Sequence, residues 1–138
     1  MAEDRTLIGE GPYPPTGPLA VLARLGFLGA VLAIAVAVFL PPWMVPSFVR
    51  SNHLEHFAAF YVATLFALAA LARTRMRVIA IALFGFATAL EGSHLLAGAA
   101  FQPLMENWVA DLGGVAATFA PVVTERFRRR FRRAPAVR

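Results

Sequence analysis

Long apolar runs alternate with short polar or proline-containing segments along this chain. The apolar runs cover residues 19–40, 56–72, 78–98 and 104–123. A helix needs about 20 apolar residues to cross the roughly 30 Å hydrocarbon core of a bilayer. Runs of this length are typical of membrane helices, whereas strands of globular proteins are much shorter. The pattern therefore predicts an all-α, polytopic integral membrane four-helix bundle.

The two ends of the chain differ from the apolar runs. Residues 1–18 are polar and rich in Pro and Gly, which predicts a flexible leader, because proline interrupts regular helix. Residues 124–138 form a basic tail, in which Phe127 and Phe131 share one helical face. We expect this tail to lie along the anionic inner leaflet, where each basic residue contributes about 1 kcal/mol. The arginines expected at that surface are Arg126, Arg128, Arg129, Arg130, Arg132 and Arg133.

The distribution of arginine predicts the orientation of the bundle. Arg73, Arg75 and Arg77 lie between the second and third runs, and seven of the thirteen arginines follow Glu125. Cytoplasmic segments carry the excess of basic residues in membrane proteins. The turn and the tail are therefore expected in the cytoplasm, and an even number of spans places both termini there.

Composition agrees with lipid as the solvent. Apolar residues make up 59% of the chain and charged residues 15%, against about a half and a quarter in soluble domains. The chain has no cysteine, which excludes disulfides, thiolate metal sites and cysteine nucleophiles. A folded basic surface large enough for nucleic acid is not expected beyond the short tail.

Polar residues inside the predicted spans form a candidate site. Glu91 and His94 share a face of the third span, Asn107 and Asp111 share a face of the fourth, and His56 begins the second. Glu91 and Asp111 both lie about 10 Å from the same end of the bundle by helical rise. Ionisable groups within a span usually face the bundle interior. These residues are expected to form one polar pocket in the outer half of the membrane.

Several interpretations of this cluster remain open. Interhelical polar contacts alone stabilise a bundle, at about 0.6 to 2 kcal/mol each. Two buried carboxylates repel, however, so one is expected to be protonated or to share a histidine proton, which is typical of functional sites. No resident cofactor is expected. Less favoured alternatives are a metal held by the carboxylate and imidazole groups and haem between His56 and His94.

Three short motifs resemble those of the VanZ-like family of small bacterial membrane proteins. They are a His followed by aromatics at His56, a membrane Glu with a polar residue three positions later at Glu91 and His94, and Asn107-x-x-x-Asp111-x-x-Gly114. The family usually has Gln at the His94 position and exchanges the acid and amide of the last motif. The resemblance implies a four-helix membrane domain of the cell envelope, located in a bacterial inner (plasma) membrane, and no defined molecular activity.

Three functional hypotheses follow. The first is an envelope protein whose outward pocket binds a lipid-linked or glycan headgroup. The second is an accessory or assembly subunit of a larger membrane complex, because the abundant Gly and Ala residues allow close helix contact. The third is a membrane enzyme that uses the carboxylates and histidines in acid–base or metal chemistry. The sequence does not decide whether the protein is an enzyme.

Overall fold

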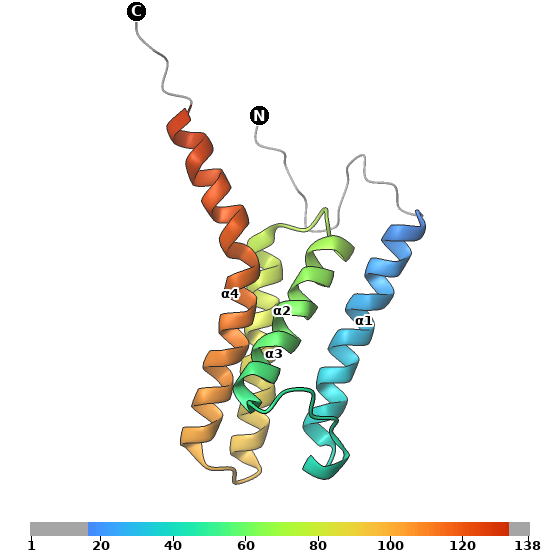
Figure 1. Cartoon of the computed structure of the whole chain (residues 1–138), viewed down its shortest axis with the longest axis vertical. Helices are drawn as coiled ribbons and strands as arrows, with labels where there is room; N and C mark the ends of the chain where they lie inside the picture. The colour runs from blue at the N-terminus through green and yellow to red at the C-terminus, as the bar shows by residue number, and fades with distance from the viewer. Residues whose placement is uncertain (1–16, 133–138) are drawn as a thin grey trace, which may run out of the picture.

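The protein is a bundle of long helices in a computed structural model that describes residues 17–132 (Figure 1). Residues 1–16 and 133–138 lie outside the described part, as do the side chains of Pro42, Arg130 and Arg132. Residues 17–132 contain no strand, so the all-α prediction is confirmed for them. The elements are α1 (Pro18–Phe39), the 3₁₀ helix η1 (Pro42–Met44), α2 (Asn52–Ala70), α3 (Met76–Leu96) and α4 (Phe101–Arg132).

A long helix occupies each of the four predicted apolar runs, and the largest differences are at the start of α2 and at the end of α4. Helix α2 begins at Asn52 rather than His56, because Ser51 caps it by accepting a hydrogen bond from the Leu54 amide. Glu55 fixes the preceding loop, since its Oε1 accepts hydrogen bonds from the Phe48 and Val49 amides at 2.6 and 2.8 Å. Residues 52–55 therefore form an additional first turn of α2 before His56.

Helix α4 is the second difference. It begins at Phe101 and continues without interruption through Pro121 to Arg132. Residues 124–132 of the predicted basic tail are thus the last part of α4, which projects beyond the other helices in Figure 1. Arg129 Nε donates to Glu125 Oε1 at 2.9 Å, and Phe127 and Phe131 make an edge-to-face contact with ring centroids 5.0 Å apart. These i, i+4 pairs support helix in the basic segment.

Helix α2 lies at the centre of the bundle. It packs against α1 and α4, α3 packs mainly against α4, and Figure 1 shows α1 and α4 on opposite sides. The core cluster lies where α2, α3 and α4 meet. Its buried members are Phe60, Ala67, Ile79, Leu83, Ala87, Leu90 and Val115.

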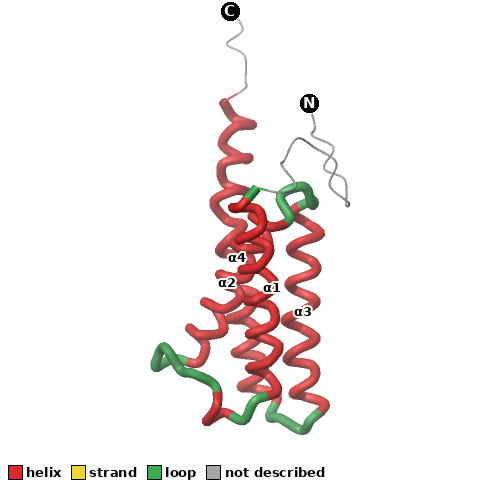
Figure 2. The backbone as a smooth tube through the Cα atoms, turned by 90° about the vertical axis from the view of Figure 1, so that its right-hand side faces the viewer, coloured by secondary structure: helices red, strands yellow, loops and turns green. Residues whose placement is uncertain are grey.

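The helices run alternately up and down. The long loop between α1 and α2 lies at the same end as the short turn between α3 and α4 (green in Figure 2). The turn between α2 and α3 lies at the other end, with the start of α1 and the basic end of α4 (Figure 1). The two arginine-rich segments therefore share one end of the bundle, as the predicted topology requires.

The outer surface of the bundle is strongly apolar. Leu19, Leu22, Leu25, Leu28 and Leu32 of α1 are all more than half exposed. Helices α1, α2 and α3 are each long and apolar enough to cross a membrane, and α4 is not among the helices that reach this hydropathy within residues 17–132. Exposed apolar surface on this scale is unusual for a soluble monomer, so the fold indicates membrane association.

The backbones of α2 and α4 approach closely at Gly114. A Cβ atom there would collide with the Phe57 carbonyl oxygen and would lie 2.9 Å from the Tyr61 nitrogen. One turn further along α4, Thr118 Oγ1 lies 3.4 Å from the Tyr61 carbonyl oxygen. Small residues allow such backbone contact in membrane helices. This contact sets the distance between α2 and α4 beside the polar residues that precede Gly114.

Candidate functional site

His56 and Asp111 form the centre of the polar cluster. His56 lies in the second turn of α2, and Asp111 lies one turn before Gly114 on α4. Their atoms Nδ1 and Oδ1 are 2.9 Å apart. The Asp111 side chain is only 1% exposed, whereas that of His56 is 27% exposed. The close approach of α2 and α4 therefore seals the carboxylate inside the bundle and leaves one edge of the imidazole accessible.

Glu91 brings a second buried carboxylate to the same point from α3. Its Oε1 lies 3.8 Å from His56 Nδ1, and its Oε2 lies 3.6 Å from His94 Nδ1. Both distances are longer than a hydrogen bond. The Glu91 side chain is 7% exposed, and its Oε2 is buried without a hydrogen-bond partner among residues 17–132. Such an oxygen is costly, because burial removes its hydrogen bonds to water.

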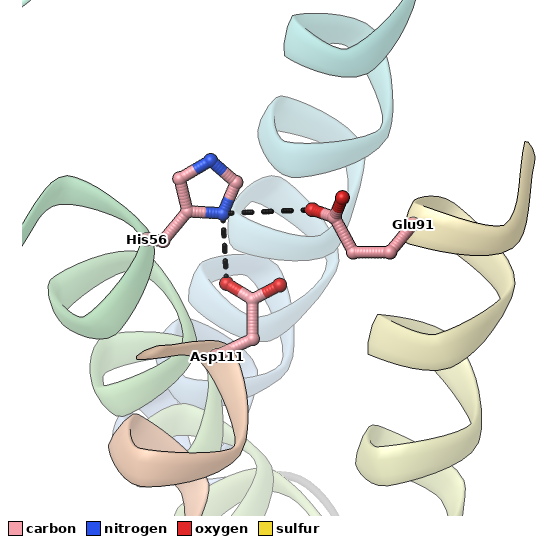
Figure 3. Close-up of side chains that lie close together, drawn as sticks. All are labelled: His56, Glu91 and Asp111. Atoms are coloured by element: carbon pink, nitrogen blue, oxygen red, sulfur yellow. Dashed lines mark hydrogen bonds and ion pairs between the residues drawn. The ribbon is translucent and has the colours of Figure 1, made fainter. Parts of the chain in front are cut away.

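The three side chains converge from three different helices (Figure 3). One atom each from His56, Glu91 and Asp111 can be chosen so that none is more than 4.8 Å from another. When His56 Nδ1 carries the proton, it donates to Asp111 and leaves Nε2 as an acceptor. Figure 3 shows Nε2 on the side of the ring that points away from both carboxylates. An imidazole oriented by a buried carboxylate is the arrangement of general bases and of metal-ligating histidines.

A second polar layer lies one helical turn closer to the end of the bundle. Asn52 Nδ2 donates to Asn107 Oδ1 at 2.8 Å, and His53 Nδ1 lies 3.2 Å from the same oxygen. His53 Nε2 pairs with Glu106 Oε2 at 3.3 Å, and both of these side chains are about half exposed. An open groove of about 600 Å³ adjoins this layer. Its lining consists of His53, Gln102, Met105, Glu106, Val109 and Ala110.

The structure thus brings together three of the five predicted site residues. His94 borders them through Glu91, and its Nε2 also lies 3.4 Å from the Val38 carbonyl oxygen of α1. Asn107 belongs to the outer layer instead. His56 of α2 lies between Glu91 of α3 and Asp111 of α4.

Sequence reasoning missed the outer layer, because His53 and Glu106 were not among the predicted site residues. A signal was present in the spacing. His53 lies three residues before His56, and Asn107 lies four before Asp111, so both helices repeat their polar face one turn outward. A contact between α3 and α4 was also missed, in which Trp108 Nε1 donates to Thr88 Oγ1 at 3.0 Å.

The predicted membrane-surface arginines are only partly described. Arg126 and Arg129 line a second cavity of about 400 Å³ beside Pro121 and Glu125. Arg128 lies on the same exposed part of α4. Arg133 lies outside the described residues, and the side chains of Arg130 and Arg132 are not described.

Comparison with protein families, with curated proteins and with solved structures found no match for this chain. The VanZ-like resemblance therefore stays a prediction that depends on the three short motifs alone.

Proposed function

We propose that the protein is an integral membrane protein of the bacterial cell envelope whose His56–Glu91–Asp111 cluster binds the polar headgroup of a lipid-linked or glycan ligand. The observation that carries the proposal is the convergence of two buried carboxylates and an imidazole from three helices of an apolar bundle. Ionisable groups in such surroundings are expensive, and they are usually retained for function.

The proposed topology has four membrane spans, with α4 as the fourth. Helix α4 packs along α2 and α3, which are both apolar enough to cross a membrane, so it shares their depth. Its first 20 residues would span about 30 Å at the helical rise. The arginine-rich end would then face the cytoplasm, with the basic part of α4 near anionic lipid headgroups. The polar cluster would face outward.

The charge of the cluster narrows the class of headgroup. Within residues 17–132, the basic groups at ion-pair distance from Glu91 and Asp111 are His56 and His94. A histidine is positively charged only when both ring nitrogens are protonated, whereas each ionised carboxylate carries a full negative charge. A phosphate would meet this negative charge, while hydroxyl or ammonium groups would donate hydrogen bonds to it. We therefore propose that the sugar or amine part of the ligand enters the cluster.

The test is the lipid content of the protein purified from its own membrane in a mild detergent. Mass spectrometry of wild-type protein is expected to detect one enriched class of lipid with a glycan or amine headgroup. The double variant Glu91→Gln/Asp111→Asn should lose it at unchanged expression. A matched control is Glu125→Gln, which alters an exposed carboxylate at the other end of the same helix and should retain the lipid. Equal lipid profiles in wild type and the double variant would refute the proposal.

A second candidate function is acid–base catalysis by His56. The specific observation in its favour is the 2.9 Å contact that lets Asp111 orient His56 and leave Nε2 free to exchange a proton. Conversion of the copurified lipid by wild-type protein, lost in His56→Gln while lipid binding persists, would favour this candidate over binding alone.

A further inference from the structure

We infer that His56, Glu91 and Asp111 form a binding site for one divalent transition-metal ion of the zinc class. The inference rests on the proposed function only in taking these three side chains as the binding centre, and it does not require the lipid ligand. The site would draw one ligand atom from each of α2, α3 and α4 (Figure 3).

The spacing of the three ligand atoms suits a small metal ion. His56 Nδ1 lies 2.9 Å from Asp111 Oδ1 and 3.8 Å from Glu91 Oε1, and the cluster as a whole extends over no more than 4.8 Å. Zinc bonds to nitrogen and oxygen measure about 2.0 to 2.2 Å, so ligand atoms of a tetrahedral site are about 3.3 Å apart. Small side-chain rotations would bring the three atoms to that separation, with the proton of the neutral His56 ring on Nε2 so that the lone pair of Nδ1 faces the metal.

Glu91 supplies a second and independent observation. Its side chain is only 7% exposed, so it is more than nine-tenths buried. In Figure 3 its carboxylate points toward His56 and Asp111. Yet its contacts at 3.6 and 3.8 Å are too long for hydrogen bonds, and Oε2 has no hydrogen-bond partner among residues 17–132. A metal ion bound at Glu91 Oε1 would neutralise the charge of this buried carboxylate, and bidentate binding would also give Oε2 a partner.

Charge balance supports a dication. Two ionised carboxylates buried in an apolar bundle carry a charge of −2, which a metal dication neutralises in one step. Mixed imidazole and carboxylate ligands suit zinc and similar ions. Calcium requires six to eight oxygen ligands, and magnesium retains most of its water, so neither fits three side chains from a packed core. Three protein ligands leave a fourth position of zinc open.

The exposed pair of His53 and Glu106 provides a matched control within the same chain. It has the same two ligand types at 3.3 Å and lies one turn outward, but both side chains are about half exposed. It therefore tests whether metal binding depends on the buried cluster or on any neighbouring His and Glu.

The experiment is a Zn²⁺ titration of the full-length protein in detergent, after chelator treatment, against a chromophoric competitor. Wild type is expected to bind one Zn²⁺ per chain, with Mg²⁺ unable to compete. Glu91→Gln and Asp111→Asn should each weaken binding more than about 100-fold, because even changes behind the ligands of a metal usually cost 10- to 100-fold. His53→Ala/Glu106→Gln should bind as wild type does.

Two further readouts make the outcome decisive. Helical circular dichroism identifies a variant that fails to fold, and Asp111→Glu, which retains the carboxylate, should recover part of the Zn²⁺ affinity that Asp111→Asn loses. Weak or absent Zn²⁺ binding by folded wild type overturns the inference. It is also overturned if His53→Ala/Glu106→Gln loses as much Zn²⁺ affinity as Glu91→Gln or Asp111→Asn does. Lipid copurification without Zn²⁺ binding would leave the proposed headgroup function intact and remove the metal alone.

Discussion

Replacing Gly114 by alanine is predicted to force α2 and α4 apart at the polar cluster. The added Cβ would collide with the Phe57 carbonyl oxygen and lie 2.9 Å from the Tyr61 nitrogen. Both of these atoms belong to helical backbone, so neither can rotate away as a side chain would. Asp111 lies one turn from the collision, and its contact with His56 at 2.9 Å spans the same interface.

Two opposing effects set the change in the free energy of unfolding of Gly114→Ala. Overpacking in a well-packed interior costs about 1 to 3 kcal/mol, and the rigid backbone neighbours place Gly114→Ala at the upper end. Alanine in a helix offsets this by up to about 1 kcal/mol relative to glycine. The net loss in free energy of unfolding is therefore about 2 kcal/mol. Gly85→Ala is the control, because nothing lies within 4 Å of a Cβ there, and it should gain up to about 1 kcal/mol.

The assay is unfolding of both variants in mixed detergent micelles with increasing denaturing detergent, followed by circular dichroism. The two variants should differ by about 3 kcal/mol, the sum of these two effects. Gly113→Ala provides a graded comparison, since its Cβ would meet only the Phe57 ring at 3.4 Å. Unfolding of Gly114→Ala at the same midpoint as Gly85→Ala would show that the α2–α4 contact does not set the position of the cluster.

Three other predictions test different parts of the structure. Thr88→Val removes the acceptor of the Trp108 indole and should cost about 0.6 to 1.7 kcal/mol, with a shift in tryptophan emission; no change in either would contradict a bond between α3 and α4. Glu106→Gln alters an exposed ion pair and should change stability by less than about 1 kcal/mol, so a larger loss in denaturing detergent would argue against its exposed position. Because the chain has no cysteine, single variants Gln102→Cys and Thr74→Cys can report orientation: an impermeant maleimide should label intact cells only at Gln102→Cys, and the reverse pattern would invert the proposed topology.

The hydropathy pattern was sufficient to predict the helices and their order. Each apolar run was long enough for one helix, and the arginine-rich segments were correctly expected to share one end of the bundle. The pattern was less informative for α4. Glu106, Asn107 and Asp111 lower its apolar character, and Pro121 suggests a boundary, yet the helix runs on to Arg132. Packing against α2 and i, i+4 pairs in the basic segment outweigh these local signals.

The sequence by itself determined which polar residues share a helical face, because the helical period places Glu91 beside His94 and Asn107 beside Asp111. Only the tertiary structure decided how those faces meet. The rotation of each helix about its axis depends on side chains from all its neighbours, and the absence of a side chain at Gly114 lets α2 approach α4. That approach made His56 the partner of Asp111 and left Glu91 without a hydrogen bond on its buried oxygen among residues 17–132.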